Sequence, residues 1–279
     1  MNSAQKQKVI LITGASSGIG KACAEQLLSE GHIVYGLARD YENLQKIPGL
    51  HALKGDMADD ASLMRVVRAI IKNEGRIDAL VNNAGYGLYG AVEDVPLEAA
   101  RAQFEVNLFG LARLTQLVLP HMRAVGSGRI INMSSMGGKV YFPMSAWYHA
   151  TKHALEGFSD GLRLDVKEFG ISVSIIEPGL IATHFGSVAD SSLVKYSGKG
   201  PYRRLAHAMA KSLTKTYGNP TSISQPSVVA KAVSHAINSS RPKTRYAVGK
   251  YAKLLIFIRK YLGDRIFDRL ALRQIKNNQ

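Results

Sequence analysis

The stretch VILITGASSGIGKACAEQLL, residues 9–28, decides the fold. It begins with an apolar, β-branched run, passes through a turn that contains Gly14, Gly18 and Gly20, and continues with apolar residues at three- and four-residue spacings. This order predicts a strand, a tight turn and a helix. Glycines let a backbone approach a ligand closely, and a helix N-terminus offers unpaired N–H groups and a positive dipole. The stretch therefore indicates a dinucleotide site, although the same glycines would also fit a turn without a ligand.

Similar apolar runs recur along the chain and alternate with amphipathic segments. Beyond residues 8–13, the strand candidates are 32–38, 51–56, 78–83, 128–134, 171–177 and, more weakly, 244–249. The helix candidates lie near 18–30, 60–74, 97–124, 147–169 and 226–239. Such alternation favours repeated βα units around a parallel sheet. We predict an α/β fold: a single doubly wound Rossmann-type domain with a parallel sheet of about seven strands.

No low-complexity linker or Pro/Gly-rich break divides the first part of the chain, and this favours one domain over residues 1–249. The segment 184–225 interrupts the alternation, and we expect it to be a mobile substrate-loop insertion with one short helix, since long insertions are often lids or binding loops. Residues 250–279 are predicted to form a basic amphipathic helical extension, in which a second short helix begins at Asp264.

Charge is distributed unevenly along the 279 residues. The net charge is +15, and residues 191–279 hold 18 of the 36 lysines and arginines, with Asp264 and Asp268 as their only acidic residues. A field of one sign attracts anions, whether phosphorylated or acidic substrates, anionic lipid or nucleic acid. Nucleic acid is not expected, because no nucleic-acid motif accompanies the charge.

The cysteine content and the apolar runs bear on the compartment. Cys23 is the single cysteine, which excludes an intrachain disulfide and fits a reduced compartment, although a cysteine-poor secreted protein would fit nearly as well. The N-terminus lacks the long apolar core of a secretory signal, and no apolar run approaches the roughly 20 residues of a membrane-spanning helix. We expect a cytoplasmic protein, with peripheral membrane contact as the alternative.

Four motifs occur in a fixed order. The glycine turn is spaced Gly-x-x-x-Gly-x-Gly, NNAG follows at 82–85, and Ser135 precedes Tyr148 by thirteen residues in a Ser…Tyr-x-x-x-Lys pattern that ends at Lys152. Together these motifs resemble the short-chain dehydrogenase/reductase family, over roughly residues 8–185. The ARD and FP…YxxxK details further resemble its hydroxysteroid and retinol dehydrogenases and its acyl-dihydroxyacetone-phosphate reductases.

The Tyr148/Lys152 pair suggests a proton donor. A tyrosine phenol titrates near pH 10, and a lysine one helical turn further on favours its phenolate, although a bare YxxxK also fits a solvated helix face. The resemblance implies that Ser135, rather than Ser134, orients the substrate oxygen and that Tyr148 transfers the proton. It further implies that Lys152 binds the nicotinamide ribose and lowers the tyrosine pKa, and that Asn107 holds a water of the proton relay. The implied reaction is hydride transfer between nicotinamide and a carbonyl carbon, without a metal.

The end of the second strand bears on the choice of cofactor. An NAD-selective dinucleotide fold has a carboxylate there for the ribose 2′-OH, but this chain has Ala38 followed by Arg39. A guanidinium can pair with the 2′-phosphate of NADP, so we predict NADPH/NADP+. In the alternative, Arg39 is solvated and Asp40 binds the ribose.

We assign cofactor contacts in four places: the glycine turn, the ends of the strands, the NNAG stretch that begins at Asn82, and the segment after residue 177. Most of them are implied by the resemblance. They are Gly14, Ser16, Ser17, Gly18, Ile19, Gly20, Arg39, Asp56, Met57, Asn83, Ala84, Gly85, Tyr148, Lys152, Pro178, Gly179, Ile181 and Thr183.

The segments that would border the substrate are mostly apolar and aromatic. They are residues 85–90, residues 137–147 and the insertion after Thr183, and they favour a lipophilic carbonyl or alcohol such as a steroid, retinoid or acyl-lipid ketone. The alternative is that half of these aromatics pack beneath the loops. The substrate contacts that we predict are Ser135, Tyr141, Tyr148 and Phe185.

Two other functions stay open. The basic insertion would suit the acidic carrier of a 3-oxoacyl thioester, which makes reduction of such thioesters an alternative. A catalytically idle protein that senses NADPH or acts as a scaffold is the alternative of another class, since a fold alone cannot exclude it. The intact set of Asn107, Ser135, Tyr148 and Lys152 argues against that role. His149 and His153 are expected to point away from the site, because neighbours on a helix face elsewhere.

The C-terminal residues have apolar positions on one helical stripe, with Lys250, Lys253, Arg259 and Lys260 largely elsewhere. The stripe consists of Tyr251, Leu254, Leu255, Ile258 and Leu262. We expect this helix to dock on the sheet or on a partner subunit; the alternative is contact with an anionic membrane. The resemblance also implies a homodimer or homotetramer, formed through the helix that bears Tyr148 and the helix before it.

Overall fold

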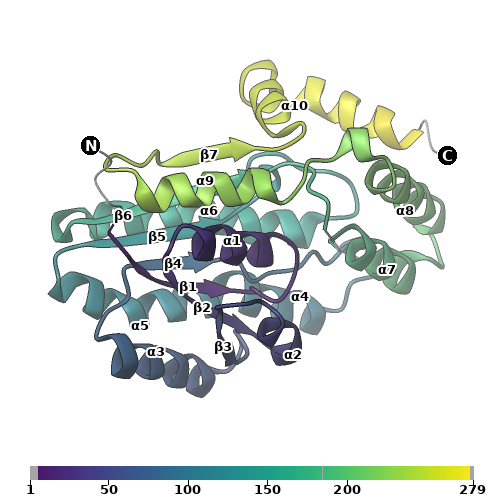
Figure 1. Ribbon diagram of the computed structural model, residues 1–279. Helices are drawn as coiled ribbons and strands as arrows, with labels where there is room; N and C mark the ends of the chain where they lie inside the picture. The colour runs from purple at the N-terminus through teal and green to yellow at the C-terminus, as the bar shows by residue number, and fades with distance from the viewer. Residues whose placement is uncertain (1–5, 184, 277–279) are drawn as a thin grey trace.

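A parallel β-sheet forms the centre of the molecule in the computed structural model, which describes residues 6–183 and 185–276 (Figure 1). Its order is β3-β2-β1-β4-β5-β6-β7, and every neighbouring pair is parallel. The strands are β1 Val9–Thr13, β2 Ile33–Ala38, β3 His51–Lys54, β4 Ala79–Asn82, β5 Gly128–Met133, β6 Ile171–Pro178 and β7 Arg245–Val248. The predicted doubly wound sheet is confirmed. The strand order reverses between β1 and β4, and ligands of such sheets bind beside that reversal, at the carboxyl ends of the strands.

Helices cover both faces of the sheet because β1 is apolar on both sides. Ile10 and Ile12 face a core shared with α1 (Gly18–Ser29) and α9 (Ser227–Asn238). Val9 and Leu11 face the opposite core, which contains residues of α3 (Asp60–Glu74), α5 (Gly110–Ala124) and α6 (Ala146–Asp165). The smaller elements are α2 Tyr41–Gln45, α4 Leu97–Phe104, η1 Glu105–Phe109, η2 Met136–Gly138, η3 Lys167–Phe169 and η4 Pro220–Ser222. The two cores hold the sheet between two helical layers.

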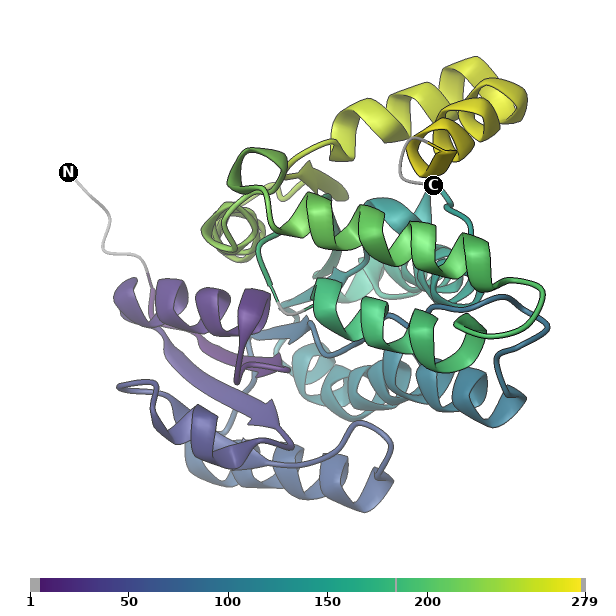
Figure 2. The same ribbon diagram turned by 90° about the vertical axis from the view of Figure 1, so that its right-hand side faces the viewer.

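The insertion after β6 differs from the prediction. Instead of one short helix it contains two, α7 (Phe185–Ser197) and α8 (Arg203–Tyr217), which pack side by side (Figure 2). Their contact is built from small and apolar residues that are buried: Ala189, Leu193, Ala206, Met209 and Ala210. The sequence of α8 is clearly amphipathic, so the prediction of one helix overlooked a periodic signal that is present in residues 203–217.

The C-terminal segment forms α10 (Ala252–Lys276), which lies beyond the edge strand β7 (Figure 1). Gly263, with φ 75° and ψ 178°, breaks it into two helical pieces, so the predicted second helix beginning near Asp264 is present. Its inner side, with Ala252 and Phe267 fully buried, packs on Met136 and Val140. Within the residues described, no helix is both long and apolar enough to cross a membrane.

Candidate active site

The glycine turn lies at the carboxyl end of β1. Gly14 and Gly18 have φ of +66° and +54°, and a Cβ on Gly20 would come within 2.1 Å of the Gly14 carbonyl oxygen. Ser17 enters α1 in extended conformation without a side-chain cap, so the side chain takes none of the first-turn N–H groups. A bare, positively polarised helix end beside a turn with no room for side chains fits a pyrophosphate.

The segment after β6 runs over this turn. Gly179 is pressed against the backbone of residue 250, where a Cβ would lie 1.9 Å from the Lys250 carbonyl oxygen. Ile181 is buried, and the Thr183 methyl group would lie 3.2 Å from a Cβ on Gly18. The structure thus brings together the glycine turn and the segment from Pro178 to Thr183, which the sequence assigns to the same ligand.

The NNAG stretch is bound to the same turn. The hydroxyl of Thr13 accepts hydrogen bonds from the backbone N–H groups of Asn83 and Ala84, each at 2.9 Å. The Asn83 amide donates to the Thr13 carbonyl oxygen at 2.9 Å. Asn82 turns into the core instead, where its amide donates to Asn132 at 2.9 Å. Asn82 therefore holds strands together, while Asn83 and Ala84 fix the segment along the predicted cofactor site.

The end of β2 has an exposed cation, Arg39, and the carboxylate next to it is engaged in hydrogen bonds. Arg39 is exposed, and it follows Ala38. Asp40 is the N-cap of α2, and its carboxylate accepts hydrogen bonds from the backbone N–H and the amide of Asn43, the former at 3.1 Å. On the neighbouring strand end, a carboxylate oxygen of Asp56 accepts from the backbone of Ala58. The capping role of Asp40 weakens the alternative in which Asp40 binds the ribose.

Tyr148 and Lys152 lie one turn apart on α6 and are both buried. Lys152 Nζ donates a 2.8 Å hydrogen bond to the Met133 carbonyl oxygen at the end of β5. A Cβ on Gly85 would come within 3.8 Å of this Nζ and within 3.0 Å of Asn107 Oδ1. The geometry thus collects the glycine of NNAG, the asparagine and the lysine in one place.

Burial governs the titration of both groups. It raises the pKa of Tyr148 to about 12, opposed by a hydrogen bond with Ser135. It lowers the pKa of Lys152 to about 8, opposed by the charge of Glu156. From the sequence, Lys152 is expected to lower the pKa of Tyr148. In the protein chain by itself the pKa is raised instead, because the cost of burying the phenolate is larger than the effect of the Ser135 hydrogen bond. Tyr148 is therefore fully protonated at neutral pH, as a proton donor must be.

Asn107 lies in η1, a π-helical turn between α4 and α5. Its side chain accepts from the Tyr86 N–H at 3.0 Å, donates to the Tyr86 carbonyl oxygen at 3.0 Å and donates to Thr151 Oγ1 at 3.1 Å. Single π-helical turns often occur at functional sites. The contacts clamp the backbone after NNAG to α6, and the water-holding role of Asn107 stays a prediction.

The loop after β5 contains Ser135, whose Oγ accepts a 3.0 Å hydrogen bond from the Gly137 N–H. Its neighbour Ser134 is buried, and its hydroxyl has no hydrogen-bond partner among the residues that the structure describes. Because the side chain of Ser135, and not that of Ser134, influences the pKa of Tyr148, Ser135 is the better candidate for orienting a substrate oxygen.

His149, which is predicted only to point away from the site, has a structural role that sequence reasoning missed. It is buried, its Nδ1 lies 2.9 Å from the Gly137 carbonyl oxygen, and its Nε2 accepts a 3.0 Å hydrogen bond from the Phe142 N–H. The two bonds require a neutral ring protonated at Nδ1, and burial accordingly lowers the pKa of His149 to about 4. The ring ties both ends of the loop that follows Ser135, and no periodic signal in the sequence could reveal this.

The α7/α8 pair covers Tyr148, which is 7% exposed. The Phe185 ring lies 5.3 Å from the Tyr148 ring, and the Tyr89 ring lies 5.9 Å from it on centroid distances. Tyr141 points elsewhere: its hydroxyl donates to Asp268 of α10 at 2.9 Å. The structure thus brings Phe185 to the candidate catalytic residue and places Tyr141 under the C-terminal helix. Its predicted role as a substrate contact stays a prediction.

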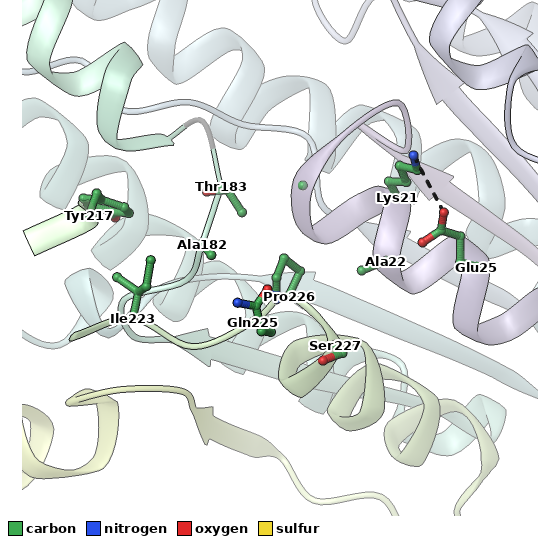
Figure 3. A pocket seen from close by; sticks show the side chains of 11 residues that line it. Lys21, Ala22, Glu25, Ala182, Thr183, Tyr217, Ile223, Gln225, Pro226 and Ser227 are labelled. Atoms are coloured by element: carbon green, nitrogen blue, oxygen red, sulfur yellow. Dashed lines mark ion pairs between the residues drawn. The ribbon is translucent and has the colours of Figure 1, made fainter. Parts of the chain in front are cut away.

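A cavity of about 700 Å³ opens beside the glycine turn rather than at Tyr148 (Figure 3). Gly18 and Lys21 of α1 border it on one side, and Thr183, Tyr217 and Gln225 border it on another. The labelled side chains lie around the gap between the start of α1 and the start of α9. This position continues the predicted pyrophosphate site, and the aromatic cover over Tyr148 explains why the cavity does not reach the phenol.

Comparison with known proteins identifies one family. A family model described as short chain dehydrogenase matches residues 8–192. The 3-ketodihydrosphingosine reductase of Bacteroides thetaiotaomicron is 36% identical over 249 residues, covering 89% of this chain and 90% of that protein. The NADPH-dependent 3-dehydrocapnine reductase of Ornithobacterium rhinotracheale is 34% identical over 280 residues, covering 95% and 96%. A solved short-chain dehydrogenase from Streptomyces avermitilis has a TM-score of 0.77 and 35% identity, covering 90% and 92%.

Proposed function

This chain belongs to the short-chain dehydrogenase family, and within it we propose an NADP(H)-dependent enzyme that reduces the carbonyl group of a lipophilic substrate, or oxidises the corresponding alcohol. The family is one of oxidoreductases that use a nicotinamide cofactor and act on CH–OH groups. The observation that carries the finer proposal is the position of Tyr148, a buried phenol beneath an apolar and aromatic cluster.

NADP(H) is favoured by charge at the end of β2. Arg39 is exposed there, Ala38 offers no carboxylate, and Asp40 is engaged as a helix cap. A guanidinium paired with a 2′-phosphate forms charge-assisted hydrogen bonds that are about twice as strong as neutral ones. The name of the Ornithobacterium relative includes NADPH, which supports the same choice. When bound, the cofactor supplies the hydride that reaches the carbonyl carbon.

The residues of the chain supply the proton and the orientation. We assign to Ser135 a hydrogen bond to the substrate oxygen, and to Tyr148 the transfer of its phenolic proton to that oxygen, which turns the ketone into an alcohol. The ammonium group of Lys152, one turn away, favours the phenolate that forms. The phenolate regains its proton from solvent, and alcohol oxidation runs the same steps in reverse.

The lining of the site favours an apolar substrate. Phe185 and Tyr89 lie over Tyr148, and the buried face of the α7/α8 pair behind them consists of alanine, leucine and methionine. The names of two relatives denote reduction of a keto group, in 3-ketodihydrosphingosine and in 3-dehydrocapnine. We therefore place a lipid ketone first among the lipophilic substrates.

Consumption of NADPH tests the proposal directly. We expect turnover with 3-ketodihydrosphingosine, and the panel also contains steroid ketones, retinal, 3-oxoacyl thioesters and small aldehydes. Tyr148→Phe should abolish turnover while NADPH binding stays intact, because the substitution removes only the hydroxyl. Substantial activity of that variant would refute the role of Tyr148. Turnover confined to 3-oxoacyl thioesters or small aldehydes would refute the lipophilic substrate.

A further inference from the structure

The outward side of α10 is unusually apolar for a solvent-facing helix. Phe257 and Tyr261 are 56% and 62% exposed, and both are large side chains. Further exposed apolar residues are Leu254, Leu262, Ile266, Leu270 and Leu272 on the two pieces of the helix, and Tyr251 directly before its start. Their spacing of three and four residues, as in 254, 257 and 261 or 266 and 270, places them on continuous helical faces. We call these residues the α10 outer face.

Basic residues lie among these apolar ones. Lys253, Lys260, Arg265 and Arg269 are exposed, and none of the salt bridges found among the described residues involves them. Asp264 and Asp268, the acidic residues of this segment, are exposed but engaged within the protein: Asp264 pairs with Arg259, and Asp268 accepts a hydrogen bond from the Tyr141 hydroxyl. The neighbouring helix α8 adds further exposed positive charge, with Arg203, Arg204, Lys211 and Lys215.

This combination of properties selects one kind of partner. In a symmetric dimer through the α10 outer face, two strongly basic surfaces would meet, and their like charges would repel. Nucleic acid would pair with the cations but would leave exposed aliphatic side chains such as Leu254 and Ile266 without a partner. An anionic bilayer satisfies both, because its headgroups attract lysine and arginine and its interface accepts apolar side chains.

We propose that the α10 outer face docks on an anionic lipid membrane. The helix lies on the surface of the bilayer, with Leu254, Phe257 and Tyr261 in the interface and Lys253 and Lys260 against acidic headgroups. The kink at Gly263 lets the second piece of the helix present its own apolar residues separately from the first.

The inner side of the same helix borders the candidate active site. Phe267 packs on Tyr141 and Phe142, with ring centroids 5.3 and 6.0 Å apart, and Phe142 is hydrogen-bonded to His149, the neighbour of Tyr148. Membrane contact therefore places the loop after Ser135 one helix thickness away from the lipid. The value of this position to the enzyme rests on the proposed function, since it shortens the path of a lipid ketone to the site, whereas docking itself needs no substrate.

Vesicle sedimentation of the full-length protein tests the docking. We expect binding to phosphatidylcholine vesicles that contain phosphatidylserine at low salt, with weaker binding at high salt and none to pure phosphatidylcholine. The double variant Lys253→Glu/Lys260→Glu should weaken binding by about tenfold or more, since each basic residue near an anionic surface contributes about 1 kcal/mol. Leu254→Glu/Phe257→Glu should have a similar effect. Both variants should fold normally, because all four substituted side chains are exposed.

The matched control carries the same change of charge elsewhere. Arg68→Glu/Lys72→Glu reverses two exposed cations of α3, at the opposite end of the molecule from α10 (Figure 1), and should leave binding unchanged. Equal losses in both charge variants would overturn the proposal in favour of a general field effect. Absence of wild-type binding at low salt would also overturn it, as would a dimer dissociated by Leu254→Glu/Phe257→Glu. NADPH-dependent turnover of a soluble short-chain ketone, measured without vesicles, reports separately on the proposed function.

Discussion

At the scale of single residues, Arg39 is the clearest determinant of the proposed preference for NADPH over NADH. It stands exposed after Ala38, where the 2′ position of an adenine ribose would lie by resemblance to the family, while the neighbouring carboxylate of Asp40 is held by Asn43. We expect Arg39→Ala to weaken NADPH binding by about ten- to hundredfold and to leave NADH binding nearly unchanged. Fluorescence titration with both cofactors measures this.

The control for that prediction is the next residue. Asp40→Ala removes a helix cap and should cost about 1 kcal/mol of stability without changing the preference between the two cofactors. If Asp40→Ala instead weakened NADH binding selectively, the carboxylate of Asp40, and not the guanidinium of Arg39, would be the group that binds the adenine ribose.

His149 acts at the same scale, through two hydrogen bonds of one neutral ring. His149→Ala leaves the Gly137 carbonyl and the Phe142 N–H without these partners, and we expect it to lower kcat and stability together. His149→Gln offers an amide donor and a carbonyl acceptor, and should restore part of the kcat. Equal kcat values for the two variants would show that the ring only fills space.

The pKa of His149 gives that prediction a pH dependence. Its value falls from 6.5 to about 4 on folding, so its contribution to stability is fully present above the unfolded pKa and is lost as the pH falls through about 4. The stability measured by urea unfolding should therefore fall less between about pH 6.5 and pH 4 in His149→Gln than in the wild type.

At the scale of elements, the sequence predicts the helices and strands whose formation depends on residues close together in the chain. The strands and the glycine turn follow from apolar runs and from glycines, and all seven expected strands are present. One short helix was predicted where α7 and α8 lie, although the amphipathic pattern of α8 could have indicated the second. The bonds of His149 and Tyr141 could not be predicted either, because they depend on how distant segments meet.

The turn between β1 and α1 yields a prediction of its own. Gly20→Ala would drive a methyl group to within 2.1 Å of the Gly14 carbonyl oxygen, a backbone atom that cannot move without distorting the turn. We expect the variant to lose NADPH binding and to have a lower Tm. Gly157→Ala is the matched control: it lies within α6, nothing lies within 4 Å of the added atom, and it should be neutral or slightly stabilising. A Gly20→Ala variant that binds NADPH normally would remove the turn from the cofactor site.

At the scale of the whole molecule, one charge cluster joins segments that are far apart in the sequence. Glu156 of α6 accepts a 3.1 Å hydrogen bond from Arg245 of β7 and forms an ion pair with Lys139, which follows η2, at 2.9 Å. Glu177 of β6 lies 3.5 Å from the same arginine, and Asp160 of α6 pairs with it at 2.6 Å. None of this could be foreseen, since the sequence reveals which residues are charged but not which strands bring them together.

Glu177 gives this cluster a measurable pH dependence. Burial, reinforced by the charge of Glu156, raises its pKa from 4.5 to about 7, so the folded protein holds a proton that the unfolded chain releases. Its raised pKa makes folding most favourable below the unfolded value, and that contribution is lost as the pH rises through about 7.

Glu177→Gln keeps the shape of the protonated side chain and removes its titration. We therefore expect the urea midpoint of the wild type to fall between about pH 5 and pH 8 relative to that of the variant, with the two proteins similar at the acid end. A substitution of the exposed Glu98 by Gln is the control and should leave the pH dependence as in the wild type. Parallel curves for wild type and Glu177→Gln would mean that Arg245 holds the carboxylate ionised, and that the proton resides elsewhere in the cluster.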